Sequence, residues 1–137
     1  ANVRYSHGRE NGMSQHGIEW FVDATGCPAL HLRARDRLRL VFDRIVDELD
    51  LHPIGPPHWH RFPNAGGLTG IWMLSESHLA IHTFPEFGSI CVNLFCCRPR
   101  SAWPWEKRLA ELLGARAVTI RSLDRNYAPL PQVETVG

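Results

Sequence analysis

This sequence of 137 residues lacks any long hydrophobic run and any strong excess of one charge. No apolar stretch approaches the roughly 18 residues that a membrane-spanning helix needs, so we expect no insertion into a membrane. The 15 basic and 14 acidic residues leave a net charge of +1, which gives no general electrostatic attraction to nucleic acid. The first 16 residues also lack the apolar centre of a signal peptide.

Cysteine is scarce, and its spacing suits neither disulfides nor a structural zinc site. The four cysteines are Cys27, Cys91, Cys96 and Cys97. There is no C-x-x-C pair of the kind that structural zinc sites use, and two adjacent cysteines are a poor basis for a disulfide framework. We therefore expect reduced thiols and a cytoplasmic protein.

The length and composition predict one domain with its own core. Residues 1–16 are polar and are expected to form a disordered leader. Residues 17–124 are expected to form the single domain, and residues 125–137, with two prolines, to form a loose tail.

Hydrophobic periodicity predicts two helices among six strands. Short turns join the four middle strands, which should therefore pair antiparallel. The order β-α-β-β-β-β-α-β then predicts an α+β fold, a two-layer sandwich in which helices cover one face of an antiparallel sheet. The expected strands are 17–27, 58–62, 68–74, 78–84, 90–97 and 117–123, and the expected helices run from Asp36 to about Asp50 and from Pro104 to Gly114.

The stretch LSESHLAIHTFPE, residues 74–86, places a serine, acids and histidines among core residues. A Ser-His-acid triad built on Ser77 is one interpretation. The G-x-S-x-G elbow that often carries such a serine is absent. Neighbouring residues of a strand also point to opposite faces, so Ser77 and His78 are poorly placed to share a site.

Four histidines on predicted strands offer a second interpretation, a metal site. They are His58, His60, His78 and His82. Imidazole is a common ligand of zinc and iron, but most histidines in proteins bind no metal. We expect no metal here.

The same stretch resembles the centre of the S-adenosylmethionine decarboxylase proenzymes, the short bacterial and archaeal kind. The similar segments are GLTGIWMLSESHLAIHTFPEFG (67–88), the strand SICVNLFCC (89–97), GIEWFVDATGC (17–27) and HRF (60–62). SESHLAIHT is the most specific of these motifs. The resemblance covers about Gly17 to Leu123.

The resemblance implies that the chain cuts itself between Glu76 and Ser77. The Ser77 hydroxyl would attack the Glu76 carbonyl carbon, and elimination and hydrolysis would then convert Ser77 into a pyruvoyl group. His82 would be the base for this processing. Thr69 would supply a hydroxyl that holds the strained carbonyl, and we expect it to reach the site by pairing across the sheet.

The pyruvoyl group is the cofactor that the family uses, with no diffusible cofactor. It forms a Schiff base with the substrate amine and acts as an electron sink, as pyridoxal phosphate does in other enzymes. By register, Cys97 would be the proton donor to the substrate carbon.

The family resemblance also implies a nucleoside pocket and a homodimer. Phe62 and Phe84 match aromatic positions that stack on adenine, and Glu86 matches the acid that holds the ribose hydroxyls. Family dimers pack their sheets together, with pockets near the interface. The small-molecule substrate would be S-adenosylmethionine, and the product would serve polyamine synthesis.

Departures from the family pattern leave other interpretations open. Phe84 stands where the family has tryptophan, Asn93 stands where it has an acid, and Ile18 and Glu19 replace two basic residues. Glu19 or Glu86 would suit a substrate ammonium or guanidinium, so a pyruvoyl-dependent ornithine or arginine decarboxylase is the alternative enzyme.

A third interpretation is an unprocessed homologue that acts as a binding or regulatory subunit. Ser77, His82 and Cys97 are all present, and a protein without catalysis has no need of all three.

Overall fold

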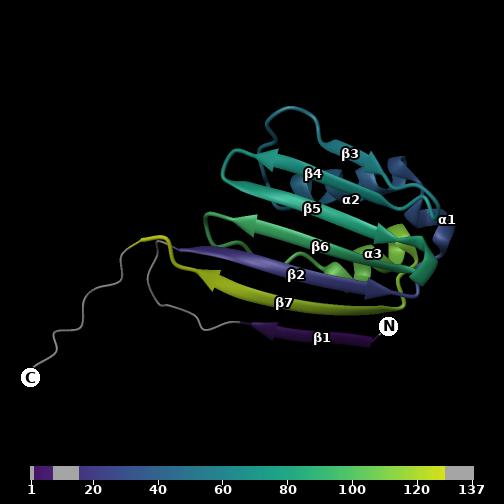
Figure 1. The fold of residues 1–137 in the computed structure, drawn as a ribbon. Helices are drawn as coiled ribbons and strands as arrows, with labels where there is room; N and C mark the ends of the chain where they lie inside the picture. The colour runs from purple at the N-terminus through teal and green to yellow at the C-terminus, as the bar shows by residue number, and fades with distance from the viewer. Residues whose placement is uncertain (1, 8–15, 129–137) are drawn as a thin grey trace, which may run out of the picture.

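The structure, a computed structural model, describes the backbone of residues 2–7 and 16–128, and the side chains of residues 16–128. The described residues form seven strands and three α-helices (Figure 1). The elements are β1 (Asn2–His7), β2 (Gly17–Thr25), α1 (Ala29–Leu32), α2 (Arg35–Glu48), β3 (His58–Arg61), β4 (Leu68–Leu74), β5 (Ser77–Phe84), the 3₁₀ helix η1 (Pro85–Phe87), β6 (Ser89–Cys96), α3 (Trp105–Leu113) and β7 (Ala117–Arg125).

All the strands belong to one sheet in the order β1-β7-β2-β6-β5-β4-β3. Every neighbouring pair is antiparallel except β1 and β7, which are parallel. The helices lie together on one side of this sheet (Figure 1). The predicted α+β two-layer sandwich is therefore confirmed. No helix among the described residues is long and apolar enough to cross a membrane.

The core lies between the helices and the sheet. Buried and exposed residues alternate along β4 and β5, as expected for a sheet with one covered face. The buried side chains of α2 fall at helical spacing and pack against this face. Gly70 of β4 lies directly under Trp59, where a Cβ atom would overlap the indole ring, so this position requires glycine. The largest fully buried residues include Trp20, Phe42, Leu79, Ile81, Leu94, Trp105 and Leu109.

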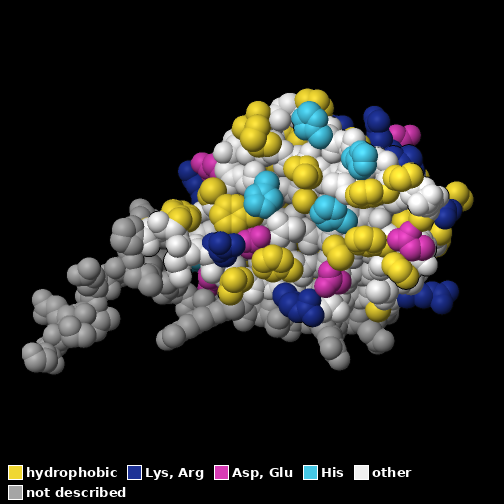
Figure 2. All heavy atoms as spheres, viewed as in Figure 1, with side chains coloured by type: hydrophobic (Ala, Val, Ile, Leu, Met, Phe, Trp, Pro, Cys, Tyr) yellow, Lys and Arg dark blue, Asp and Glu magenta, His cyan; other side chains and the backbone are white. Residues whose placement is uncertain are grey.

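The other face of the sheet carries no helix and exposes apolar side chains. Figure 2 views this face and shows hydrophobic residues intermixed with histidines. We call it the open face. Its exposed apolar residues include Phe21, Ile71, Met73, Phe84 and Leu123.

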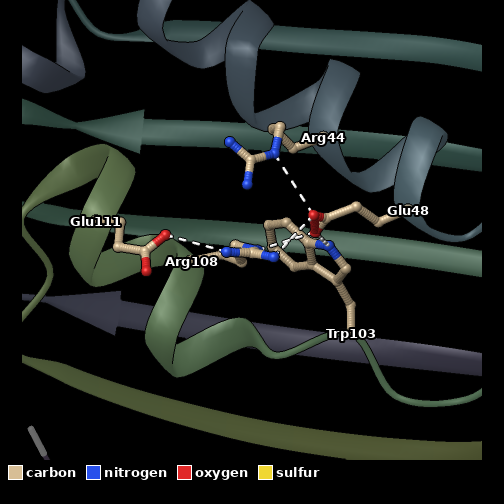
Figure 3. Close-up of polar contacts among 5 residues, drawn as sticks. All are labelled: Arg44, Glu48, Trp103, Arg108 and Glu111. Atoms are coloured by element: carbon tan, nitrogen blue, oxygen red, sulfur yellow. Dashed lines mark hydrogen bonds and ion pairs between the residues drawn. The ribbon is translucent and has the colours of Figure 1, made fainter.

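The end of α2, the start of α3 and the loop before α3 are joined by a polar cluster around Glu48 (Figure 3). Trp103 Nε1 donates to Glu48 at 2.8 Å, and Arg108 donates to both carboxylate oxygens at 2.9 Å. Arg44 and Glu111 extend the cluster on the two helices. The hydrogen bond from Arg108 is the largest cause that lowers the pKa of Glu48 below its ordinary value.

The N-terminal segment differs from its prediction. Residues 2–7 form β1, which pairs with β7, whereas a disordered leader was expected over residues 1–16. The cause is the edge of β7, which offers unpaired backbone groups to an extended segment of any composition. Residues 1 and 8–15 of the expected leader lie outside the described residues, as do residues 129–137 of the tail.

Candidate active site

The β4–β5 turn carries Ser77. Ser75 and Glu76 form the turn, and Ser77 is the first residue of β5. Ser77 pairs with Leu74 on one side and with Cys96 on the other. It lies on the helix side of the sheet and is half-buried, whereas Glu76 is exposed.

Residues that follow β6 hold the Glu76–Ser77 peptide from the side. The backbone N–H of Cys97 donates to the carbonyl oxygen of Glu76 at 2.8 Å. The Arg98 guanidinium contacts the Glu76 carboxylate through Nε at 3.1 Å and Nη2 at 3.2 Å. Ser77 and Cys97 line one small cavity of about 10 Å³, which is room for about one water molecule.

Thr69 and His82 form a second polar pair. They lie opposite each other on β4 and β5, and Thr69 Oγ1 is 3.0 Å from His82 Nδ1. His82 is on the open face, five residues along β5 from Ser77. At about 3.3 Å per residue this places it on the order of 16 Å away, on the opposite face. Thr69 therefore reaches His82 but not Ser77 of the same chain, although it was expected to reach the cleavage site.

The predicted substrate-binding residues converge at the far end of β5. Phe62, Phe84 and Glu86 line a pocket of about 160 Å³ together with Pro63, Ala65, Gly67 and Thr83. The rings of Phe62 and Phe84 are partly exposed, so they offer apolar surface to a ligand. Apolar walls with one acid are typical of a small-molecule pocket.

Comparison with known proteins finds a matching family. The family model described as S-adenosylmethionine decarboxylase matches residues 18–126.

This chain belongs to the S-adenosylmethionine decarboxylase family. A proenzyme of that name from Thermoanaerobacter sp. (strain X514) is 35% identical over 87% of this chain and 95% of the relative. The proenzyme from Pelotomaculum thermopropionicum is 38% identical, over 58% of this chain and 63% of the relative, so this alignment spans less than two thirds of that protein. The adenosylmethionine decarboxylase of Aquifex aeolicus has the same fold, with a TM-score of 0.70, 20% identity and coverage of 89% of this chain and all of that one.

The sequence did not predict a hydrogen-bonded network around Glu19 on the open face of this decarboxylase family member. His78 Nε2 lies 3.0 Å from Asn93 Oδ1, and Asn93 Nδ2 donates to Glu19 at 2.8 Å. Arg125 also donates to Glu19, which is only 7% exposed. The sequence feature that could have indicated this network is Glu19, an acid that stands between the apolar residues Ile18 and Trp20 of β2. Because both carboxylate oxygens already have partners, Glu19 is poorly suited to hold a substrate cation.

The triad and metal interpretations find no support in the geometry. Ser77 faces the helices, whereas His78 and His82 face the open side. His78 stacks on Phe95, with ring centroids 5.5 Å apart, and His60 contacts Phe62 by its edge. Across residues 16–128, no three His, Cys, Asp or Glu side chains are grouped as metal ligands.

The four cysteines are free and differ in exposure. Cys27 and Cys96 are buried, and desolvation raises the pKa of each thiol to about 11. Cys91 is exposed on the open face opposite His82, and Cys97 is half-buried beside the Glu76 carbonyl. Of the four, Cys97 is the thiol that lies at the Ser77 cavity with some exposure to solvent.

Proposed function

We propose that this chain is a cytoplasmic proenzyme that cuts itself between Glu76 and Ser77 and then decarboxylates S-adenosylmethionine. The observation that carries the proposal is the contact of the Glu76 carbonyl with the Cys97 N–H, at the peptide where the family motif places cleavage. Its four free thiols fit a reducing compartment.

Self-cleavage needs only the chain and one water molecule. The Ser77 Oγ attacks the Glu76 carbonyl carbon, the C–N bond breaks, and an ester replaces the amide while the Ser77 nitrogen becomes an amine. A base removes the Ser77 α-proton, and the Cβ–Oγ bond breaks, which releases the Glu76 carboxylate. Tautomerisation and addition of water then release ammonia and leave a pyruvoyl group at the new N-terminus. The Cys97 N–H stabilises the negative charge that develops on the Glu76 oxygen in the first step.

The residues around Ser77 fit a pyruvoyl group formed at this position. Such a group supplies the electron sink for decarboxylation. Cys97 lines the same cavity, so its thiol can donate a proton to the substrate carbon after carbon dioxide leaves. Cys96, which pairs with Ser77 across the sheet, lines the same cavity, but it is only 2% exposed and so is less accessible to a substrate than Cys97.

We propose that His82 and Thr69 act on the Ser77 of a second copy in a homodimer. Within one chain they lie about 16 Å from Ser77 and on the other face, so His82 needs a different Ser77 to act as processing base. The open face that carries them is also rich in exposed apolar side chains, including Ile71, Met73 and Phe84. A two-fold interface would bury this face and bring opposite ends of the two β5 strands together. Because Ser77 is the first residue of β5 and only half-buried, His82 of the other copy would approach it around the β4–β5 turn rather than through the sheet.

The Phe62–Phe84 pocket would hold the nucleoside part of the substrate. The two rings would stack on adenine, which contributes on the order of 1 kcal/mol beyond area burial, and Glu86 would accept hydrogen bonds from the ribose hydroxyls. The pocket of about 160 Å³ is smaller than the roughly 300–1,000 Å³ of most ligand sites. It therefore accounts for one part of the substrate. In the dimer, the reacting carbon would lie at the Ser77 of the other copy.

Intact mass under denaturing conditions tests the proposal first. We expect two fragments that divide at Glu76–Ser77, the second blocked by a pyruvoyl group, and a single uncut chain for Ser77→Ala. The processed protein should release carbon dioxide from S-adenosylmethionine. Release from ornithine or arginine instead would establish the alternative decarboxylase. A wild-type chain that remains uncut would favour the binding or regulatory subunit.

A further inference from the structure

The Glu76 side chain has a partner that neither the family motif nor the proposed chemistry uses. Arg98 contacts both carboxylate oxygens of Glu76, with Nε to Oε2 at 3.1 Å and Nη2 to Oε1 at 3.2 Å. This is the planar two-point arrangement that a guanidinium forms with a carboxylate, and it fixes orientation as well as distance.

The β4–β5 turn has few other restraints. Ser75 and Glu76 are exposed, so core packing does not hold them in place. The Ser75 N–H donates to the His52 carbonyl at 2.8 Å, and the Glu76 carbonyl accepts from the Cys97 N–H. Arg98 therefore adds a side-chain restraint to Glu76, the residue whose carbonyl carbon is attacked. Arg98 also follows Cys97 directly, so both restraints on Glu76 come from neighbouring residues.

The attack of a side chain on its own preceding carbonyl depends on conformation. The Ser77 Oγ must come within about 3–3.5 Å of the Glu76 carbonyl carbon along a suitable direction. Rotation of the Glu76 peptide would move that carbon, and it would also break the hydrogen bond that the Glu76 carbonyl oxygen accepts from the Cys97 N–H. A restraint on the Glu76 side chain opposes this rotation.

We propose that Arg98 is a positioning residue for self-cleavage, which holds the Glu76 side chain so that the scissile carbonyl stays on the Cys97 N–H. This inference rests on the proposed self-processing. The effect is on the rate of cleavage rather than on folding, because Arg98 is 70% exposed and Glu76 48% exposed in their side chains. Exposed pairs of this kind contribute little to global stability.

The test is a pulse–chase measurement of cleavage after cell-free synthesis, followed on denaturing gels. Arg98→Ala should slow the conversion of full-length chain to fragments about fivefold. Arg98→Lys keeps the charge but loses the two-point geometry. Its rate of cleavage should lie between those of the wild type and of Arg98→Ala. Glu76→Gln should be slow as well, and the double variant Glu76→Gln/Arg98→Ala should be no slower than the slower single variant.

A matched control and a stability measurement separate positioning from folding. Glu111→Gln removes another exposed carboxylate–arginine contact, at 3.2 Å to Arg108 on α3, and should cleave at the wild-type rate. In a Ser77→Ala background that stays uncut, adding Arg98→Ala should leave the thermal midpoint within about 2 °C.

Two results would overturn the role of Arg98, and a third would also overturn the proposed self-processing. Wild-type cleavage by Arg98→Ala would show that the contact plays no part, and a large fall in thermal midpoint would make it a structural contact. Failure of the wild-type chain itself to cleave would remove the proposed self-processing as well, so the two failures can be told apart.

Discussion

At the scale of single residues, chain neighbours separate and distant residues meet. Ser77 and His78 are adjacent, yet they lie on opposite faces of the sheet because strand side chains alternate. Cys97 is twenty residues after Ser77 in the numbering, yet its N–H lies 2.8 Å from the carbonyl that precedes Ser77. The chemistry of this site therefore depends on strand register rather than on sequence distance.

The thiols should differ sharply in reactivity for the same reason. Desolvation raises the pKa of Cys27 and Cys96 to about 11, so very little of either is thiolate at pH 8. In native Ser77→Ala protein, iodoacetamide should leave both unmodified while Cys97, the half-buried neighbour of Cys96, reacts. All four cysteines should react once the chain is unfolded. Peptide mass mapping over time measures this, and early labelling of Cys96 would contradict the burial of its thiol.

At the scale of elements, the layer of helices is joined by polar contacts as well as by its core. Glu48 near the end of α2 accepts hydrogen bonds from Trp103 and from Arg108 of α3 (Figure 3). These residues are far apart in sequence, so the contact can form only after both helices have packed on the sheet. The Glu48 cluster is therefore formed only when the helices have packed together on the sheet.

The Glu48 cluster predicts a pH dependence of stability with a definite sign. The hydrogen bond from Arg108 lowers the pKa of Glu48 in the folded state below its value in the unfolded chain. The ionised Glu48 therefore contributes to the free energy of unfolding above the pKa of the unfolded chain, about 4.3. This contribution is lost as pH falls through the lower pKa of the folded state.

Denaturant unfolding at several pH values would measure this contribution. As pH falls, the free energy of unfolding should decrease less steeply in Glu48→Gln than in the wild type. Arg108→Ala should reduce the slope similarly, because it removes the hydrogen bond that lowers the pKa of Glu48 most. Equal acid slopes in all three proteins would show that Glu48 is not linked to folding.

At the scale of the whole molecule, the proposed cleavage site and the proposed substrate pocket lie at opposite ends of one strand. Ser77 begins β5, whereas Phe84 ends it beside the pocket proposed for the substrate. The Thr69–His82 pair lies between them on the open face. One copy of the chain therefore holds all the predicted groups without bringing them together, which is why a second copy is part of the proposal.

Mixing two inactive variants tests whether the copies cooperate. Ser77→Ala has no residue to convert, and His82→Ala lacks the proposed base, so each should remain mostly uncut alone. After joint refolding in equal amounts, about half of the His82→Ala chains should pair with a Ser77→Ala chain that supplies His82, and these should be cut.

The control for this experiment replaces the helper by Ser77→Ala/His82→Ala, which offers no base and should give no cleavage. Denaturing gels measure the cut fraction. Efficient cleavage of His82→Ala by itself, or no rescue by Ser77→Ala, would show that His82 does not act across the dimer.

Much of the fold could be predicted because its elements have strong local patterns. The alternation of β4 and β5, and the apolar spacing of α2, are set by which residues must avoid water, so they can be read from one chain. The β1 strand has only a short alternation, with Val3 and Tyr5 between polar residues of an otherwise polar segment, and it was not foreseen. Backbone pairing at a sheet edge needs no particular side chain, which leaves little trace in composition.

The sequence by itself determined the family, through SESHLAIHT, and the residue types on which the proposed chemistry depends. Tertiary structure alone decided which of them meet. It placed the Cys97 N–H on the Glu76 carbonyl, paired Arg98 with Glu76, and separated His82 from Ser77 of the same chain. The physical reason is that strand register and the choice of face are set by the packing of the whole sheet, so no local stretch of sequence specifies them.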